Sequence, residues 1–131
     1  MFSQSADGYF DWRAAVNGVP PMADAESVEH VRQICRGSGQ ALIRRGLTER
    51  YLDQVWCVPR FRLVESVAEH IELKRKVFKK LDVDGRCLDG KMQANVTLAE
   101  DIDVYVEIEL RGNQIVILAA HSHTPGKRLP Q

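Results

Sequence analysis

Apolar and polar residues alternate most regularly in the segment Ile102–His123, near the end of the chain. From Ile102 to Leu110 every second residue is apolar, as expected for a strand with one face on a core and one face in water. The pair Gly112-Asn113 follows, and both residue types tolerate the positive φ of a hairpin turn. An apolar run then leads from Ile115 to His121. The segment therefore predicts a β-hairpin.

A two-residue turn fixes the register of this hairpin, because a three-residue turn would set Glu109 against Ile115 and exchange the two faces. The predicted pairs are Leu110 with Ile115, Ile108 with Ile117, Val106 with Ala119, Val104 with His121 and Ile102 with His123. Both histidines are therefore expected on the core side of the last strand, at its far end.

The rest of the chain is mostly helical in its periodicity. In chain order we expect helices over residues 24–36, 40–45, 49–57 and 60–81, and a strand over residues 91–98. Asp24 is the expected N-cap of the first helix, and Gly37-Ser38-Gly39 interrupts the helical pattern after it. Part of residues 69–81 alternates well enough to form a strand instead.

Helices followed by strands predict an α+β domain, in which N-terminal helices pack on one face of a C-terminal antiparallel β-meander of about three strands. Residues 1–22, rich in aromatic residues, glycine and proline, are expected to form an N-terminal lead-in segment. Residues 23–131 are expected to form a single α+β domain, because a chain of this length is commonly one domain.

The chain has no net charge, but its charges are unevenly distributed. Residues 1–31 carry five acidic and one basic side chains, residues 32–80 carry five and twelve, and residues 81–131 carry eight and five. The basic middle segment indicates either an anion-binding surface or a solvated helix face. No apolar run approaches the ~20 residues of a membrane helix, and the first ten residues do not resemble a signal peptide. We therefore expect a cytoplasmic protein without membrane contact.

We expect no metal and no cofactor. Asp82–Gly90 begins like a calcium loop, but Arg86 and Gln93 stand where that loop needs an oxygen ligand and a glutamate. The three cysteines are odd in number and widely spaced, which predicts buried or half-buried free thiols in a reducing compartment. A metal pair of His121 and His123 would lack a third ligand.

His121 and His123 are the candidate catalytic residues, because two imidazoles can divide general acid and general base work. Alternate residues of a strand lie about 6.5–7 Å apart, so the two rings could flank one phosphate. The candidate phosphate-binding cations are Arg44, Arg45, Lys74, Arg75, Lys127 and Arg128. This set suits a metal-independent ribonuclease. In the alternative interpretation, His121 is a hydrogen-bonded histidine at the core edge and His123 an exposed loop residue. His30 and His70 are expected at the surface.

The stretch Gln40–Trp56, QALIRRGLTERYLDQVW, resembles the helix pair of small bacterial RNase-type toxin domains. In those domains a meander follows whose last strands are similar to Val104–His121. The layout of residues 40–123 resembles the barnase/EndoU/colicin/RelE-like superfamily, which implies an RNA-cleaving activity. The chain departs from that pattern in its neutral charge and in having no histidine from Ser38 to Arg45, where those domains often carry one.

Two other functions fit the same sequence. One is a non-enzymatic protein-interaction module, such as an immunity, adaptor or assembly protein. It would pair through a sheet edge or through the acidic side chains Asp103, Glu107 and Glu109, as a homodimer or with another protein. The other is a small-ligand-binding α+β domain.

Overall fold

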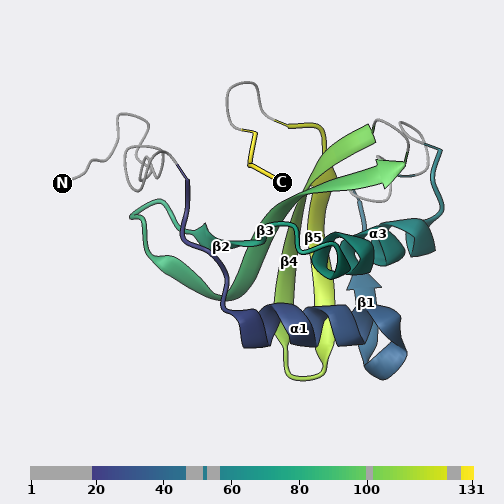
Figure 1. Ribbon diagram of the computed structural model, residues 1–131, viewed down its shortest axis with the longest axis horizontal. Helices are drawn as coiled ribbons and strands as arrows, with labels where there is room; N and C mark the ends of the chain where they lie inside the picture. Colours follow the sequence, from purple (N-terminus) through teal and green to yellow (C-terminus); the bar gives the residue numbers. More distant parts are fainter. Residues whose placement is uncertain (1–18, 47–51, 53–56, 100–101, 124–127) are drawn as a thin grey trace.

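The computed structural model describes residues 19–46, 52, 57–99, 102–123 and 128–131. They form two α-helices and a five-stranded mixed sheet (Figure 1). The elements in chain order are α1 (Ala25–Gln33), the π-helix η3 (Ile34–Ser38), β1 (Gln40–Ile43), α3 (Arg60–Glu72), β2 (Phe78–Leu81), β3 (Cys87–Ala99), β4 (Ile102–Arg111) and β5 (Gln114–His121).

The strands lie in the order β1-β5-β4-β3-β2. β1 is parallel to β5, and the other neighbours are antiparallel. Both helices cover the same face of the sheet (Figure 1), which we call the core face, and we call the opposite face the outer face. The α+β class predicted from the sequence is therefore confirmed, whereas the three-stranded antiparallel meander is too small and lacks the parallel strand.

The main core lies between the two helices and the core face. Its fully buried members come from every layer: Val31 of α1, Ile34 of η3, Leu63 and Val67 of α3, and Val96, Val104, Val106, Ile115 and Ile117 of the sheet. Burying a side chain of this kind stabilises the fold by roughly 1.5–3 kcal/mol. As predicted, Asp24 caps α1, and its carboxylate accepts a hydrogen bond of 2.9 Å from the backbone N–H of Ser27.

The helix predicted over residues 40–45 is wrong, because Gln40–Ile43 forms strand β1. Gly37 ends the helical run with a φ of 109°, a value that favours glycine. Gly39 then passes so close to the β4–β5 turn that a Cβ atom would overlap the backbone oxygen of Asn113. The N–H of Gln40 donates to the same oxygen over 3.1 Å, and the chain continues in parallel beside β5.

The helix predicted through residue 81 ends at Glu72, and the strand alternative is confirmed for Phe78–Leu81. The break falls where the apolar period fails, at Lys74, whose φ is 61°. The backbone there satisfies its hydrogen bonds by a turn: the N–H of Lys74 donates to the oxygen of Ile71 over 2.9 Å. The strand predicted over residues 91–98 lies within the longer β3.

Two predicted segments fall largely outside the described residues. They are the N-terminal lead-in, of which residues 19–22 are described, and the helix over residues 49–57, of which Leu52 and Cys57 are described. Within the described part of the chain, no helix is both long and apolar enough to cross a membrane.

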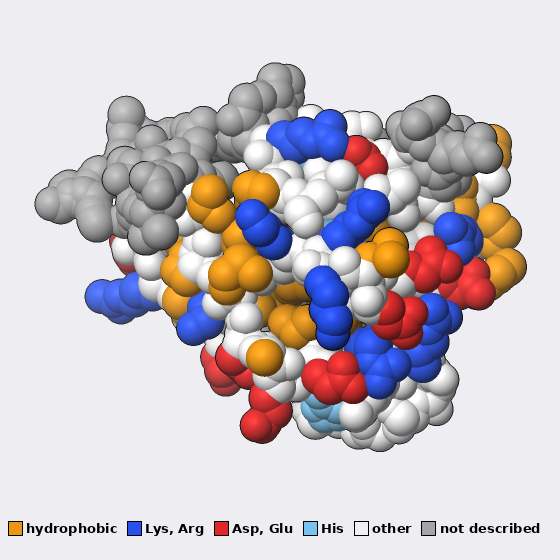
Figure 2. Space-filling model, in the orientation of Figure 1, with side chains coloured by type: hydrophobic (Ala, Val, Ile, Leu, Met, Phe, Trp, Pro, Cys, Tyr) orange, Lys and Arg blue, Asp and Glu red, His pale blue; other side chains and the backbone are white. Residues whose placement is uncertain are grey.

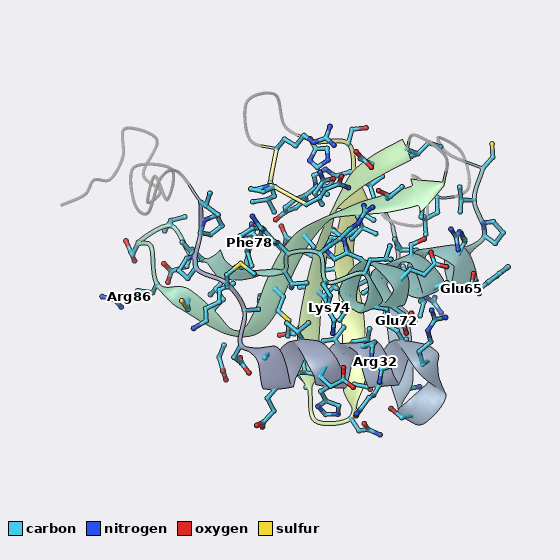
Figure 3. The ribbon with its side chains drawn as sticks, in the orientation of Figure 1. Arg32, Glu65, Glu72, Lys74, Phe78 and Arg86 are labelled. Carbon is cyan, nitrogen blue, oxygen red and sulfur yellow. The ribbon has the colours of Figure 1, made fainter. Side chains whose placement is uncertain are left out.

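In the basic middle segment, arginine and glutamate side chains form ion pairs on the surface of the helices. Arg32 and Arg36 both contact Glu72, at 3.4 and 2.7 Å, and so join α1 and η3 to α3. Arg32 and Glu72 project toward each other (Figure 3), and side chains of both signs lie together over the two helices (Figure 2). These arginines therefore match the alternative of a solvated helix face.

Candidate functional site

The predicted hairpin between β4 and β5 is present, with its turn at Gly112-Asn113. Leu110 pairs with Ile115 and Ile108 with Ile117, as predicted. Beyond that point the register shifts, so that Glu107 pairs with Ala119 and Val106 with Ala120. Leu118 is therefore an extra residue on β5, a β-bulge.

The bulge overturns the predicted position of His121. His121 pairs with Tyr105 instead of Val104, so it lies on the outer face and not on the core side. Its ring lies 5.2 Å from the Tyr105 ring, centroid to centroid. Its Nδ1 is 2.7 Å from the backbone oxygen of Ser122, which can only accept a hydrogen bond. Nδ1 therefore carries the proton, and Nε2 has the lone pair of the neutral ring.

Tyr105 joins His121 to a pair of opposite charges on the outer face. Its hydroxyl donates to the carboxylate of Glu107 over 2.7 Å and accepts from the Nζ of Lys80 over 3.0 Å. Lys80 also lies 3.1 Å from Glu107 and 5.5 Å from the centre of the Tyr105 ring. Burial, reinforced by the nearby Glu107 carboxylate, raises the pKa of Tyr105, so its hydroxyl stays protonated.

Asp103 connects β3, β4 and the C-terminal residues on the same face. Its carboxylate accepts from Thr97 over 2.8 Å, from Gln131 over 3.3 Å and from Arg128. Burial tends to raise the pKa of Asp103, but the hydrogen bonds from Thr97 and Arg128 outweigh it and hold the pKa below its usual value. A negative charge is therefore fixed beside Arg128.

His123 lies beyond the end of β5, so its predicted pairing with Ile102 is also wrong. Burial lowers its pKa, the charge of Arg128 lowers it further, and Asp103 opposes them. Both ring nitrogens are buried, and neither has a hydrogen-bond partner among the residues that the structure describes. The lowered pKa favours the neutral imidazole. We call His121, His123, Asp103, Tyr105 and Arg128 the outer-face cluster.

The predicted phosphate-binding cations are dispersed. Arg128 belongs to the outer-face cluster, and Arg75 is linked to it through Thr97, whose hydroxyl lies 3.3 Å from the Arg75 guanidinium. Lys74 lies on the helix side, where its charge acts on Glu29 of α1. Arg44 and Arg45 follow β1 as exposed side chains, and Lys127 lies outside the described residues.

Sequence reasoning did not assign catalytic or binding roles to Lys80 and Tyr105, nor a buried position to His70. Tyr105 occupies a polar position of the alternating strand, like Asp103 and Glu107, and such positions predict only a solvated face. His70, expected at the surface, is 3% exposed. The signal was present, because His70 lies at helical spacing from Leu63 and Val67 on the apolar side of α3.

The acidic side chains considered for partner binding are already paired within the chain. Asp103 contacts Arg128, Glu107 contacts Lys80, and Glu109 lies 2.9 Å from Arg111. The outer face therefore presents balanced pairs of charges instead of an acidic patch.

Among the described residues, no group of three or more His, Cys, Asp and Glu side chains is arranged to hold a metal ion. Cys35, Cys57 and Cys87 are free thiols, as predicted, but the predicted burial is wrong for two of them: Cys35 is half-buried, whereas Cys57 and Cys87 are exposed. The side chains of the outer-face cluster offer proton transfer by imidazole and charge stabilisation by guanidinium.

Comparisons of the chain with known protein families, with curated proteins and with solved structures found no match.

Proposed function

We propose that the outer-face cluster is an acid–base site that cleaves RNA without a metal ion. One observation carries the proposal. The Leu118 bulge turns His121 onto the face that also holds Asp103 and Arg128, where its charge acts on His123. Two imidazoles of one cluster, beside a fixed guanidinium, are the groups that transesterification of RNA requires.

The lowered pKa of His123 suggests how the two histidines divide the roles. His123 is the general base, because its lowered pKa keeps it neutral near physiological pH. It takes the proton of the RNA 2′-hydroxyl, whose oxygen then attacks the adjacent phosphorus. His121 in its protonated form is the general acid, and its Nε2 gives a proton to the departing 5′-oxygen. Arg128, whose side chain is 57% exposed, stabilises the charge of the pentacoordinate phosphorus.

RNA must gain access to a buried ring nitrogen of His123. Each nitrogen of His123 has less than 1 Å² of exposed surface, so the RNA must open a path to one of them. A substrate hydroxyl that reaches this nitrogen supplies the hydrogen bond that the ring lacks. An unsatisfied buried group of this kind costs roughly 1–3 kcal/mol, which favours such an exchange.

The test is incubation of the protein with total tRNA in the presence of EDTA, alongside His121→Ala and His123→Ala. Each substitution is expected to lower the cleavage rate by about 10²–10⁴-fold, the usual contribution of a general acid or base. Arg86→Ala is the matched control, because this exposed arginine lies at the distant end of the β2–β3 hairpin (Figure 3). No cleavage by the unmodified protein, or equal cleavage by both histidine variants, would contradict the proposal.

A further inference from the structure

A pocket of about 250 Å³ lies between α3 and the edge of β3. Its lining includes Arg62, Glu69 and His70 of α3, Arg75 after the helix, and Thr97 of β3. The volume is room for about eight water molecules. It lies beside the outer-face cluster, with Thr97 between them, but His121, His123 and Arg128 are not among its lining residues.

Glu69 supplies a negative charge to the lining of the pocket. Arg62 contacts two carboxylates, Glu65 at 3.4 Å and Glu69 at 3.3 Å, so one arginine is shared by two acids. Arg62 also donates to the backbone oxygen of Leu98 over 3.2 Å. A carboxylate can accept several hydrogen bonds, so Glu69 retains acceptor capacity within the pocket.

Arg75 supplies a positive charge to the same lining. Its guanidinium donates to the hydroxyl of Thr97, and among the described residues it has no carboxylate at ion-pair distance. Burial is the main cause of the lowered pKa of His70, and the positive charge of Arg75 lowers this pKa further. A half-buried guanidinium without an anionic partner is a site for a carboxylate.

His70 adds an acceptor to the wall. Its Nε2 is 2.7 Å from the backbone oxygen of Lys76, and a carbonyl only accepts, so Nε2 carries the proton. Nδ1 then holds a lone pair, which is buried and has no partner within the described part of the chain. A bound N–H donor that reached this nitrogen would remove the cost of leaving it unsatisfied.

We propose that this pocket binds a free α-amino acid with an apolar side chain. Its carboxylate pairs with Arg75, and its ammonium pairs with Glu69 and lies toward His70. Leu73, which lines the same pocket and is 64% exposed, offers the apolar side chain a surface at the rim. A ligand with both charges on one carbon matches a small pocket whose lining holds side chains of both signs.

The test is isothermal titration of the full chain with three probes of similar shape. They are L-leucine, 4-methylpentanoate, which lacks the ammonium, and 3-methylbutylamine, which lacks the carboxylate. L-leucine is expected to bind saturably with a Kd of about 1 mM or tighter, and each of the other two at least about tenfold more weakly. Saturable binding of none of the three, or binding of 4-methylpentanoate as tight as that of L-leucine, would overturn the proposal.

Two variants locate the site. Arg75→Gln can keep the hydrogen bond to Thr97, and Glu69→Gln can keep a contact with Arg62, so both are expected to fold. Each is expected to weaken L-leucine binding at least about tenfold, the effect of losing one charge-assisted hydrogen bond. Arg86→Gln is expected to leave it unchanged. Binding that either pocket variant leaves unchanged, or that Arg86→Gln weakens equally, contradicts the assignment. RNA cleavage is measured separately, so the two proposals can fail independently.

Discussion

Tyr105 and His121 face each other across β4 and β5, with their ring centroids 5.2 Å apart and their planes inclined by 40°. This contact depends on the bulge at Leu118, because an uninterrupted ladder would set His121 against Val104 in the core. The aromatic contact, the Lys80–Glu107 pair and the hydrogen bonds to Asp103 together give the outer face an ordered polar layer.

Deletion of Leu118 tests the bulge. Without this residue, Ala119 follows Ile117 directly and pairs with Glu107, so the ladder becomes regular and His121 keeps Tyr105 as its partner on the outer face. We therefore expect the deletion variant to fold and to keep the contact between the rings of Tyr105 and His121, measured as a nuclear Overhauser effect. Leu118→Ala keeps the bulge and the chain length and serves as the control. Loss of the ring contact in the deletion variant alone would contradict the register described above.

Tyr105→Phe tests the polar layer. The substitution keeps a ring against His121 but removes the hydroxyl that donates to Glu107, a charged acceptor. We expect a loss of about 1.5–3 kcal/mol in the free energy of unfolding, the usual effect of a hydrogen bond to a charged group. A second measurement uses the raised pKa of Tyr105. Its phenolate absorbance should appear at higher pH than that of an exposed tyrosine, and an ordinary titration would contradict the burial of this hydroxyl.

His70 gives a dependence of stability on pH. Burial lowers its pKa below the usual 6.5, so the unfolded chain binds more protons than the folded chain just below this pH. Stability should therefore be fully present above about pH 6.5 and decline as the pH falls toward the folded pKa. His123 acts in the same direction.

The measurement is urea unfolding at several values between about pH 7.5 and 5, where carboxylates with lowered pKa remain charged. His70→Gln can still donate to the backbone oxygen of Lys76 and does not titrate. The decline should be shallower in this variant, with the remainder due to His123. A decline as steep as in the unmodified chain would show that His70 is not the group responsible.

Alanine substitutions at Gly39 and Gly46 distinguish a steric cost in stability from the cost of a strained backbone conformation. Gly39 has an extended backbone, but an added Cβ would overlap the backbone oxygen of Asn113, whereas Gly46 has a φ of 93° and open space around it. We expect Gly39→Ala to cost up to about 3 kcal/mol, because β1 must move away from the turn. Gly46→Ala should cost about 1 kcal/mol, the strain of a positive φ. Thermal unfolding compares them, and the reverse order would contradict the close approach.

Local patterns were sufficient for the elements that depend on local chemistry. The alternation from Ile102 to Leu110 predicted β4, the Gly112-Asn113 pair predicted the turn, and Asp24 predicted the start of α1. Strand β1 could not be found in this way, since Gln40–Ile43 is too short to show a period. Its strand conformation depends on a parallel partner about 70 residues later in the chain.

The same distinction explains the errors at the candidate site. The run Ile115–Ala120 is apolar on both sides of Leu118, so nothing in it marks the bulge or the face on which His121 lies. Alternation was extrapolated through the bulge, and each residue after it was assigned to the wrong face. The Arg128–Asp103 contact joins the C-terminal residues to β4, and no local pattern predicts it.

The most direct test of the central claim is cleavage of uridylyl-adenosine in EDTA, followed by detection of the product. We expect the unmodified protein to form the 2′,3′-cyclic phosphate and free adenosine, because the 2′-oxygen is the nucleophile. His121→Ala should reduce the rate by about 10²-fold or more, and the 2′-deoxy analogue should not react. Absence of the cyclic product, or cleavage of the deoxy analogue at the same rate, would contradict an acid–base site at His121 and His123.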